Sequence, residues 1–416
     1  MSSDWQLLTL GEFLQLQRGH DLTAGEQLPG RVPVMGSAGP NGTHSVAKAK
    51  GPGVVIGRSG SSIGRVHFSA VDFWPHNTCL YVTDFFGNNQ RFAFYLLQTL
   101  NLATYNSGSA QPSLNRNYIY SIKLRVPGRP EQDRIVELLE VLEDEIALLK
   151  QINITLEAIA QTLFKSWFID FDPVHAKVEG LAPEGIDQFT AALFPDSFET
   201  SALGIIPRGW RVSTISGVCA NIFSGGTPST SRPDFWTGDF KWLSSGETRD
   251  SIITDTEKRI SQAAVDGSST RLALPGDVVI ASAGQGKTRG QTSYCAIPTS
   301  INQAVIALRA YLDRCEPSWL YYNLARRYEE MRMLSDSHSI RGSLTSKLLA
   351  DMKSCIPPPP VMAAFGGIAN SLLDAQVNNA KEAKSLSDLR DAFLPRLISG
   401  KLRIPEAEEL IEEVAA

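Results

Sequence analysis

Two short motifs in this chain of 416 residues invite comparison with enzyme signatures. The stretch GQGKT at Gly284–Thr288 follows an apolar run, as a phosphate-binding loop does. The pattern G-x-x-x-x-G-K-[ST] requires glycine where Ala281 stands, however, and the following RGQTSY is a poor start for a helix that would receive phosphate. DPVH at Asp172–His175 matches only the first half of the D-P-P-Y motif of amino-methyltransferases. We therefore expect neither ATP binding nor methyl transfer by this chain.

The sequence also offers little for metal or redox chemistry. Four of the six histidines (His20, His44, His67 and His76) fall in the N-terminal third of the chain, without metal-ligand spacing. The five cysteines are scattered and form no C-x-x-C pair, and no P-D…(D/E)-x-K arrangement of nucleases is present. We expect no metal site and no catalytic residues. With neither a signal peptide nor a long apolar span, the expected location is a reducing cytoplasm, away from membranes.

Charge is distributed unevenly along the chain. Residues 1–128 carry 10 Lys and Arg against 6 Asp and Glu, and residues 209–357 carry 17 against 14. Residues 129–208 carry 6 against 15, and residues 358–416 carry 6 against 9. The basic balance of the first pair of segments favours a polyanionic partner, and the acidic balance of the other pair favours protein partners.

The acidic segments contain two long helices with a heptad repeat, the first from Glu131 to about Phe168. A second copy follows at a constant offset, and the alignment holds without a gap from Leu114, which matches Leu344. Asn379 and Glu382 place polar residues on the second seam, where they could select one antiparallel pairing. The predicted coiled-coil seam comprises Ile135, Leu138, Leu142, Leu149, Ile152, Leu156, Ile159 and Leu163, with Phe365, Ile368, Leu372, Leu386, Leu389 and Phe393.

The basic segments have the short apolar runs and turn residues of mixed α+β domains. PGDVVIASAG at 275–284 parallels PGVVIGRSG at 52–60, and NQAVIAL parallels NTCLYVT. The predicted organisation is a first domain (1–128), a first spacer helix (129–170), a connector (171–208), a second domain (209–357), a second spacer helix (358–400) and a C-terminal tail (401–416).

The order of these parts resembles the specificity subunit of type I restriction-modification enzymes. The resemblance is carried by LFKSWFIDFDPVHAK, LGIIPRGWRVSTI, FLPRLISGKLRIPEAEEL and the paired blocks GVVIGRSGSSIGRV and DVVIASAGQGKTRG, and it covers nearly the whole chain. It implies an α+β fold with two similar mixed α/β target recognition domains, separated by an antiparallel two-helix coiled coil with pseudo-two-fold symmetry. Each domain would read one half of a split double-stranded DNA sequence.

The resemblance also implies partners. The helices would dock two copies of a methyltransferase subunit, and S-adenosylmethionine would bind that subunit while this chain holds no cofactor. A restriction subunit would join through the complex.

Loops that interrupt the strands supply the expected DNA contacts, because Arg, Lys, Asn, Gln and Ser suit phosphates and base edges. In the first domain these are Arg18, His20, Asn41, His44, Arg58, Ser59, Ser61, Ser62, Arg65, Gln111 and Asn115. In the second domain they are Lys241, Arg249, Gln285, Lys287, Thr288, Arg289, Ser339 and Arg341.

Two alternatives come from other classes. A nuclease or ATPase hidden in one domain would lack the motifs above, and a catalytic centre gives no reason for two equivalent domains. A structural coiled-coil adaptor would bind protein, not DNA, through its basic loops. Salt-dependent, sequence-specific DNA binding separates the adaptor from the recognition subunit.

Overall fold

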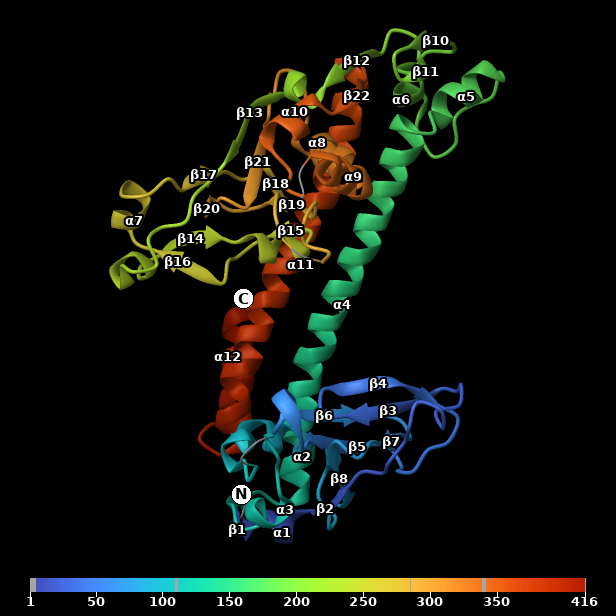
Figure 1. The fold of residues 1–416 in the computed structure, drawn as a ribbon. Helices are drawn as coiled ribbons and strands as arrows, with labels where there is room; N and C mark the ends of the chain where they lie inside the picture. Colours follow the sequence, from blue (N-terminus) through green and yellow to red (C-terminus); the bar gives the residue numbers. More distant parts are fainter. Residues whose placement is uncertain (1–4, 109–110, 285, 339–341, 416) are drawn as a thin grey trace. The chain divides into compact units, whose positions relative to one another are not determined.

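The chain divides into two compact units, each of which contains a mixed sheet and parts of both long helices. The computed structural model describes residues 5–108, 111–284, 286–338 and 342–415. The first unit combines residues 1–146 with 384–416, and the second comprises residues 147–383. The long helices α4 (Arg129–Phe168) and α11 (Pro359–Ile398) each contribute to both (Figure 1). No helix in the described ranges is long and apolar enough to span a bilayer.

The first unit is built around a sheet with the strand order β2-β8-β5-β6. A smaller sheet, β4-β3-β7, contains a parallel β3–β7 pair, and β1 pairs with β9. The strands are β1 (Gln6–Thr9), β2 (Gln15–Arg18), β3 (Val32–Gly36), β4 (Gly39–His44), β5 (Gly53–Gly57), β6 (Val66–Ser69), β7 (Trp74–Pro75), β8 (Cys79–Asp84) and β9 (Lys123–Val126). The helices beside them are α1 (Leu10–Phe13), α2 (Gln90–Thr99), α3 (Arg116–Ile119) and, near the C-terminus, α12 (Ile404–Ala415).

The position of strand β5 in the sheet explains why its sequence, GVVIG, does not alternate between apolar and polar residues. It lies between β8 and β6, and both of its faces are buried. Val54 and Ile56 join the cluster that includes helix α2, whereas Val55 joins a second cluster with Met35 and Phe73. Side chains of a strand alternate between faces, so one strand supplies two cores.

The second unit repeats this plan. Its sheet has the order β13-β21-β18-β19-β15, and a smaller sheet, β16-β14-β20-β17, contains a parallel β14–β20 pair. The strands are β12 (Arg211–Thr214), β13 (Cys219–Ser224), β14 (Phe240–Leu243), β15 (Ile252–Ile253), β16 (Lys258–Ile260), β17 (Arg271–Ala273), β18 (Val278–Ala281), β19 (Thr292–Cys295), β20 (Thr299–Ile301), β21 (Val305–Ala310) and β22 (Lys353–Ile356). The helices are α7 (Gln262–Asp266), α8 (Pro317–Ala325), α9 (Tyr328–His338) and α10 (Ser346–Asp351).

Four strands of the second sheet match the four strands of the first sheet in the same order, and β15 is added at one edge. The order β2-β8-β5-β6 corresponds to β13-β21-β18-β19, and the β1–β9 pair corresponds to β12–β22. The runs that appear as parallels in the sequence, PGVVIGRSG and PGDVVIASAG, supply the equivalent central strands β5 and β18. The internal repeat and the mixed α/β fold predicted from the sequence are confirmed.

The segment predicted as an irregular connector is more ordered than its prolines suggest. It contains α5 (Asp172–Val178), α6 (Gln188–Ala192) and a hairpin of β10 (Phe198–Ser201) with β11 (Gly204–Pro207). Val174, Phe194 and Ile206 are buried in the core of the second unit, which holds the segment in place. Sequence periodicity missed these elements because each of them is too short to show a repeat.

The long helices pack antiparallel in each unit. In the first unit, Ile135 and Leu139 near the start of α4 share a core with Phe393 and Leu397 near the end of α11. In the second unit, the ring centroids of Trp167, near the end of α4, and Phe365, near the start of α11, lie 6.1 Å apart. The antiparallel two-helix pairing predicted from the heptads is confirmed.

The predicted heptad register needs one correction. Its first positions are buried at Ile135, Leu142, Leu149, Phe365 and Phe393, and half-buried at Leu156, Leu163, Leu372 and Leu386. Of the predicted second row, Ile152, Ile159 and Ile368 are exposed by 38%, 50% and 42%, and Leu138 and Leu389 are only half-buried. The second buried row lies one residue later, at Leu139, Ile146, Ala160, Trp167, Ala369, Gln376, Ala383 and Leu397. Both the predicted row and the row one residue later contain apolar residues. The apolar face of each helix is therefore wider than the surface that one partner helix can cover.

Candidate nucleic-acid interface

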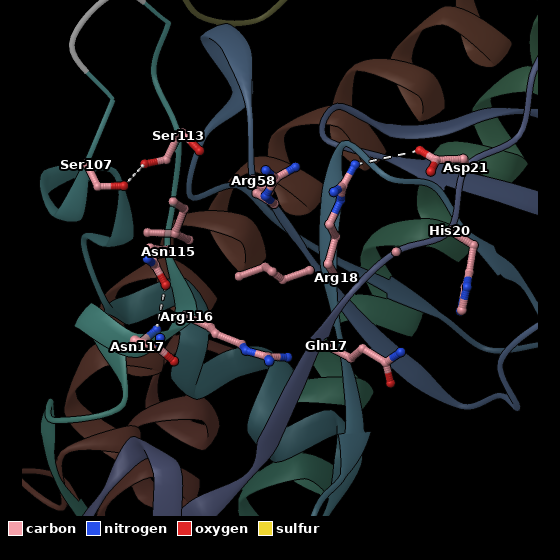
Figure 2. A pocket seen from close by; sticks show the side chains of 13 residues that line it. Gln17, Arg18, His20, Asp21, Arg58, Ser107, Ser113, Asn115, Arg116 and Asn117 are labelled. Carbon is pink, nitrogen blue, oxygen red and sulfur yellow. Dashed lines mark hydrogen bonds and ion pairs between the residues drawn. The ribbon is translucent and has the colours of Figure 1, made fainter.

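A polar cavity of about 700 Å³ lies in the first unit, where several strands and loops meet. The end of β2 supplies Gln17 and Arg18, the residue after β5 supplies Arg58, and the start of α3 supplies Arg116. Figure 2 shows these side chains around the cavity, together with Asn115 and Asn117. Loops at strand ends, positioned by a buried sheet, are where proteins commonly place binding residues.

Hydrogen bonds hold two of the three arginines in place. Arg58 Nη1 donates to the carbonyl oxygen of Asn77 at 3.0 Å, and Arg116 Nη1 donates to the carbonyl oxygen of Leu16 at 2.8 Å. Arg18 lies 3.6 Å from the Asp21 carboxylate, and both of those side chains are exposed. A guanidinium has five N–H donors, so each arginine keeps donors for a ligand.

Asn115 and the preceding loop shape the other side of the cavity. Asn115 is the N-cap of α3, and its side-chain oxygen accepts a hydrogen bond from the backbone N–H of Asn117 at 3.0 Å. Asn106 accepts hydrogen bonds from the backbone N–H groups of Gly108 and Ser113, closing the base of the loop. The predicted contact Gln111 is exposed on this loop but does not line the cavity.

The predicted contact residues in the turn after β5 differ in their exposure to solvent. Ser61 and Arg65 are exposed, whereas Ser62 is buried. Ser59 is half-buried; its backbone N–H donates to Ser37 Oγ at 3.2 Å and its hydroxyl reaches the Thr78 carbonyl at 3.4 Å. Ser59 and Ser62 therefore stabilise the turn. Their packing does not favour the prediction that they contact a ligand.

The two histidines that were predicted as contacts also differ in their surroundings. His20 lines the cavity, and its Nε2 lies 3.2 Å from the Tyr81 hydroxyl. His44 is 5% exposed, its Nδ1 accepts a hydrogen bond from the backbone N–H of Leu28, and its ring lies edge-on to Trp74. His44 is thus a core residue in this structure, which is a correction to its prediction as a contact, while Asn41 is exposed on β4.

In the second unit, a cavity of about 820 Å³ is lined by some of the predicted DNA-contact residues. Arg249 and Lys287 line it together with Arg332, and Glu157 and Tyr321 form another part of its wall. The hydroxyl groups of Tyr321 and Tyr322 each reach Glu157 at 3.3 Å, and burial, followed by the charge of Glu157, raises the pKa of both tyrosines.

Three predicted cations of the second unit, including Arg249, already have acidic partners. Arg289 is 8% exposed and donates to the carboxylate of Asp336 and the carbonyl of Gly342, so its prediction as a free contact is corrected. Lys241 lies 3.3 Å from Asp255, and Arg249 lies 3.0 Å from Glu257. Thr288 is half-buried in the turn after β18. Gln285, Ser339 and Arg341 fall outside the described residues.

Several cavity residues were not predicted from the sequence: Gln17, Arg116 and Asn117 in the first unit and Arg332 in the second. Arg116 and Asn117 directly follow the predicted Asn115, so extending that loop to Asn117 would have found them. Arg332 lies on α9, and only the tertiary fold brings that helix to the turn after β18, where its Nη1 donates to the Gly286 carbonyl at 2.6 Å.

The two enzyme-like motifs lack the structural context that their chemistry needs. The element after the GQGKT turn is strand β19, not a helix whose N-terminus could receive phosphate. DPVH forms the start of α5, where Val174 is buried and His175 packs on Phe198. Within the described ranges, no group of His, Cys, Asp and Glu side chains is arranged to hold a metal ion.

Comparisons with known proteins agree with this arrangement. Residues 2–158 match the family described as type I restriction modification DNA specificity domain. The HindI specificity subunit of Haemophilus influenzae is 26% identical over 331 residues, which cover 70% of this chain and 71% of the relative. The MjaIX specificity subunit of Methanocaldococcus jannaschii is 23% identical over 76% of this chain and 69% of its own length.

A crystal structure of the type I restriction-modification S subunit from M. genitalium has a similar fold. It matches with a TM-score of 0.62 at 17% identity, over 95% of this chain and 96% of that one. The family match over residues 2–158, the named relatives across most of the chain and the duplicated fold together show that this chain is similar, over most of its length, to type I restriction-modification specificity subunits.

Proposed function

We propose that this chain reads a split DNA sequence, with each unit recognising one half-site for a type I restriction-modification complex. The observation that carries the proposal is the duplicated sheet, β2-β8-β5-β6 and β13-β21-β18-β19, with different side chains on the loops at its strand ends. Equivalent scaffolds with different loops are suited to reading different base sequences in a similar way. The chain itself performs no catalysis, as a specificity subunit.

The recognition chemistry follows from the side chains around the cavities. Arg18, Arg58 and Arg116 can donate to phosphate oxygens or to guanine O6 and N7, and Asn115 can pair with adenine. In the second unit, Arg249, Lys287 and Arg332 offer the same types of donor. Phosphate contacts would supply salt-dependent affinity, and contacts to base edges would supply sequence preference.

The long helix α4 carries a surface for the protein partner. Leu148, Ile152 and Ile159 are exposed by 52%, 38% and 50%, and their spacing places them on one face of the helix. This face lies outside the buried seam and is exposed in this structure, so it can pack against helices of a methyltransferase subunit. Exposed apolar patches commonly mark sites of protein–protein interaction, which supports a partner contact at this face.

The repeat of the helix leads us to expect two copies of that partner, bound unequally. The offset that pairs Leu114 with Leu344 also pairs Leu148, Ile152 and Ile159 with Asn378, Glu382 and Leu389. A second copy on α11 would therefore meet a more polar surface than the first. S-adenosylmethionine would be held by the partner, and a restriction subunit would join the same complex.

Gel-shift titrations of the chain with its methyltransferase subunit test this function. We expect sequence-specific binding whose affinity falls linearly with the logarithm of salt concentration. Mapping methylated bases in DNA from cells that express the pair should reveal two short half-sites separated by unread base pairs. Binding without sequence preference, or no binding of DNA at all, would favour the adaptor.

A further inference from the structure

The three arginines of the first cavity have serine at every equivalent position of the second unit. Arg58 and Ser282 follow the matched strands β5 and β18 and make the same backbone contacts. The carbonyl of Arg58 accepts from the N–H of Leu114 at 2.8 Å, and the carbonyl of Ser282 accepts from the N–H of Leu344 at 2.9 Å. The two positions are therefore structurally equivalent.

The strand ladders relate the second pair, Arg18 and Ser224. In the first unit Arg18 lies opposite Leu80, which lies opposite Ile56, and Arg58 follows on the same strand end. In the second unit Ser224 lies opposite Ile306, which lies opposite Ile280, and Ser282 follows at the same spacing. Glycine follows at Gly19 and Gly225, so the local chain also matches.

The helix starts relate the third pair, Arg116 and Ser346. Arg116 is the first residue of α3 and Ser346 is the first residue of α10. Each helix has a side-chain N-cap, Asn115 in one and Thr345 in the other. Arg116 and Ser346 are also related by the same sequence offset as Leu114 and Leu344.

The exchange changes the charge of the site. The first cavity is lined by three arginines and one carboxylate, Asp21, which lies near Arg18 alone. Within the described residues, Arg58 and Arg116 hydrogen-bond to carbonyl oxygens and form no ion pair with an acid. In the second unit, the three equivalent positions carry uncharged serines, and the cations Lys241, Arg249 and Arg289 elsewhere in that unit each have an acidic partner. Uncompensated guanidinium groups around one cavity favour an anionic ligand.

We propose that the three arginines of the first cavity bind phosphate groups of the DNA backbone, and that the second unit has no such anchor at the three equivalent positions. The proposal rests on the function proposed above. The first unit then carries the larger share of salt-dependent affinity, whereas the serines of the second unit leave it more dependent on contacts with bases. The two half-sites would thus be bound by different means despite the shared fold.

The test compares two variants of the full chain in complex with its methyltransferase subunit. The first combines Arg18→Ser, Arg58→Ser and Arg116→Ser, which gives the first cavity the residues of the second. The matched control combines Arg31→Ser, Lys123→Ser and Arg125→Ser, which removes three exposed cations that do not line the cavity. We expect the slope of log affinity against log salt to become shallower by about 2 to 3 in the cavity variant, and by much less in the control.

Arg18→Ser alone guards against a folding defect, because Arg18 makes no backbone hydrogen bond through its side chain in the described structure. It should make the slope shallower by about 1 with an unchanged melting temperature. The loss should be equal for DNA with intact and with scrambled half-sites, since phosphates carry no sequence information.

Three results would contradict the proposal that the first cavity binds DNA phosphate. An unchanged slope in the cavity variants, with normal binding by the wild-type complex, would refute it while leaving the proposed function intact. Loss confined to DNA with the intact first half-site would assign the arginines to base reading. A wild-type complex without any salt-dependent DNA affinity would refute the proposed function and the anchor together.

Discussion

The side-chain amide of Asn379 donates a hydrogen bond to the side-chain oxygen of Asn153 at 2.9 Å, within the seam between α11 and α4 in the second unit. The amide of Asn153 in turn donates to the backbone carbonyl of Gln376 at 2.9 Å. Both asparagines are half-buried. A polar pair in such a seam costs stability but favours the one helix alignment in which both partners meet.

Replacing one of these asparagines should be worse than replacing both. Asn153→Leu leaves the amide of Asn379 without its acceptor, and we expect a loss of about 1 to 3 kcal/mol in the free energy of unfolding. The double variant with Asn379→Leu should regain most of that loss, because it removes both polar groups. Urea denaturation of the single and double variants measures this, and additive losses would contradict the pairing.

Arg289 should affect stability more than DNA sequence preference. Its guanidinium is buried against Asp336 and the Gly342 carbonyl. Asp336→Asn removes the compensating charge, so we expect a lower melting temperature with half-site preference retained. Asp351→Asn is a matched control, because the ion pair of Asp351 with Lys347 is exposed. A change of half-site preference without loss of stability would instead support direct reading by Arg289.

The cysteine thiols should be unreactive in the native protein. Burial raises the pKa of Cys79 and of Cys295 to about 12, so almost no thiolate is present near pH 8. We expect slow modification by a thiol reagent in native protein and rapid modification of all five cysteines after denaturation. Fast native labelling of Cys79 or Cys295 would contradict their burial.

The same thiols give a stability trend with a defined sign. Because their pKa is raised on folding, the folded state retains protons that the unfolded state releases above about pH 8.5. Their contribution to stability is therefore complete below that pH and is lost as the pH rises toward 12. Cys79→Ala should make the unfolding free energy less dependent on pH between about 8.5 and 10.

The exposed face of α4 should be required for partner assembly. Ile152→Glu combined with Ile159→Glu should reduce methyltransferase binding at least tenfold, because it places charge in an apolar contact. Ile154→Glu is the control: Ile154 is exposed by 63% but lies on a different side of the helix. Native mass spectrometry compares the assemblies. Equal loss in both variants would indicate a general defect in the helix.

Helix length should set the number of unread base pairs. Inserting one heptad into both α4 and α11 adds about 10 Å of helix and preserves the seam pattern. We expect the spacer in a methylation-site map to change by about three base pairs, with both half-site sequences retained. An unchanged spacer would refute this role of the helices.

The sequence alone was sufficient for the repeat and the long helices, because both depend on periodicity that survives differences in loop length. One constant offset relates Leu114 to Leu344 and the first long helix to the second, and the apolar run GVVIG predicts a strand, which the structure shows to be buried along its whole length. Heptad spacing predicts an antiparallel helix pair and correctly places Asn379 in the seam, whereas Glu382, which was also predicted there, is exposed.

Only the tertiary structure decided which side of each helix and which loop cations are available. Leu138 and Leu139 are both apolar, so spacing could not show that packing against α11 buries the row of Leu139 and leaves Ile152 exposed. Arg289 was predicted as a DNA contact and Arg116 was not, yet Arg289 is buried against Asp336 and Arg116 lines a cavity. Burial and ion pairing depend on residues distant in the chain, and local patterns carry no record of those neighbours.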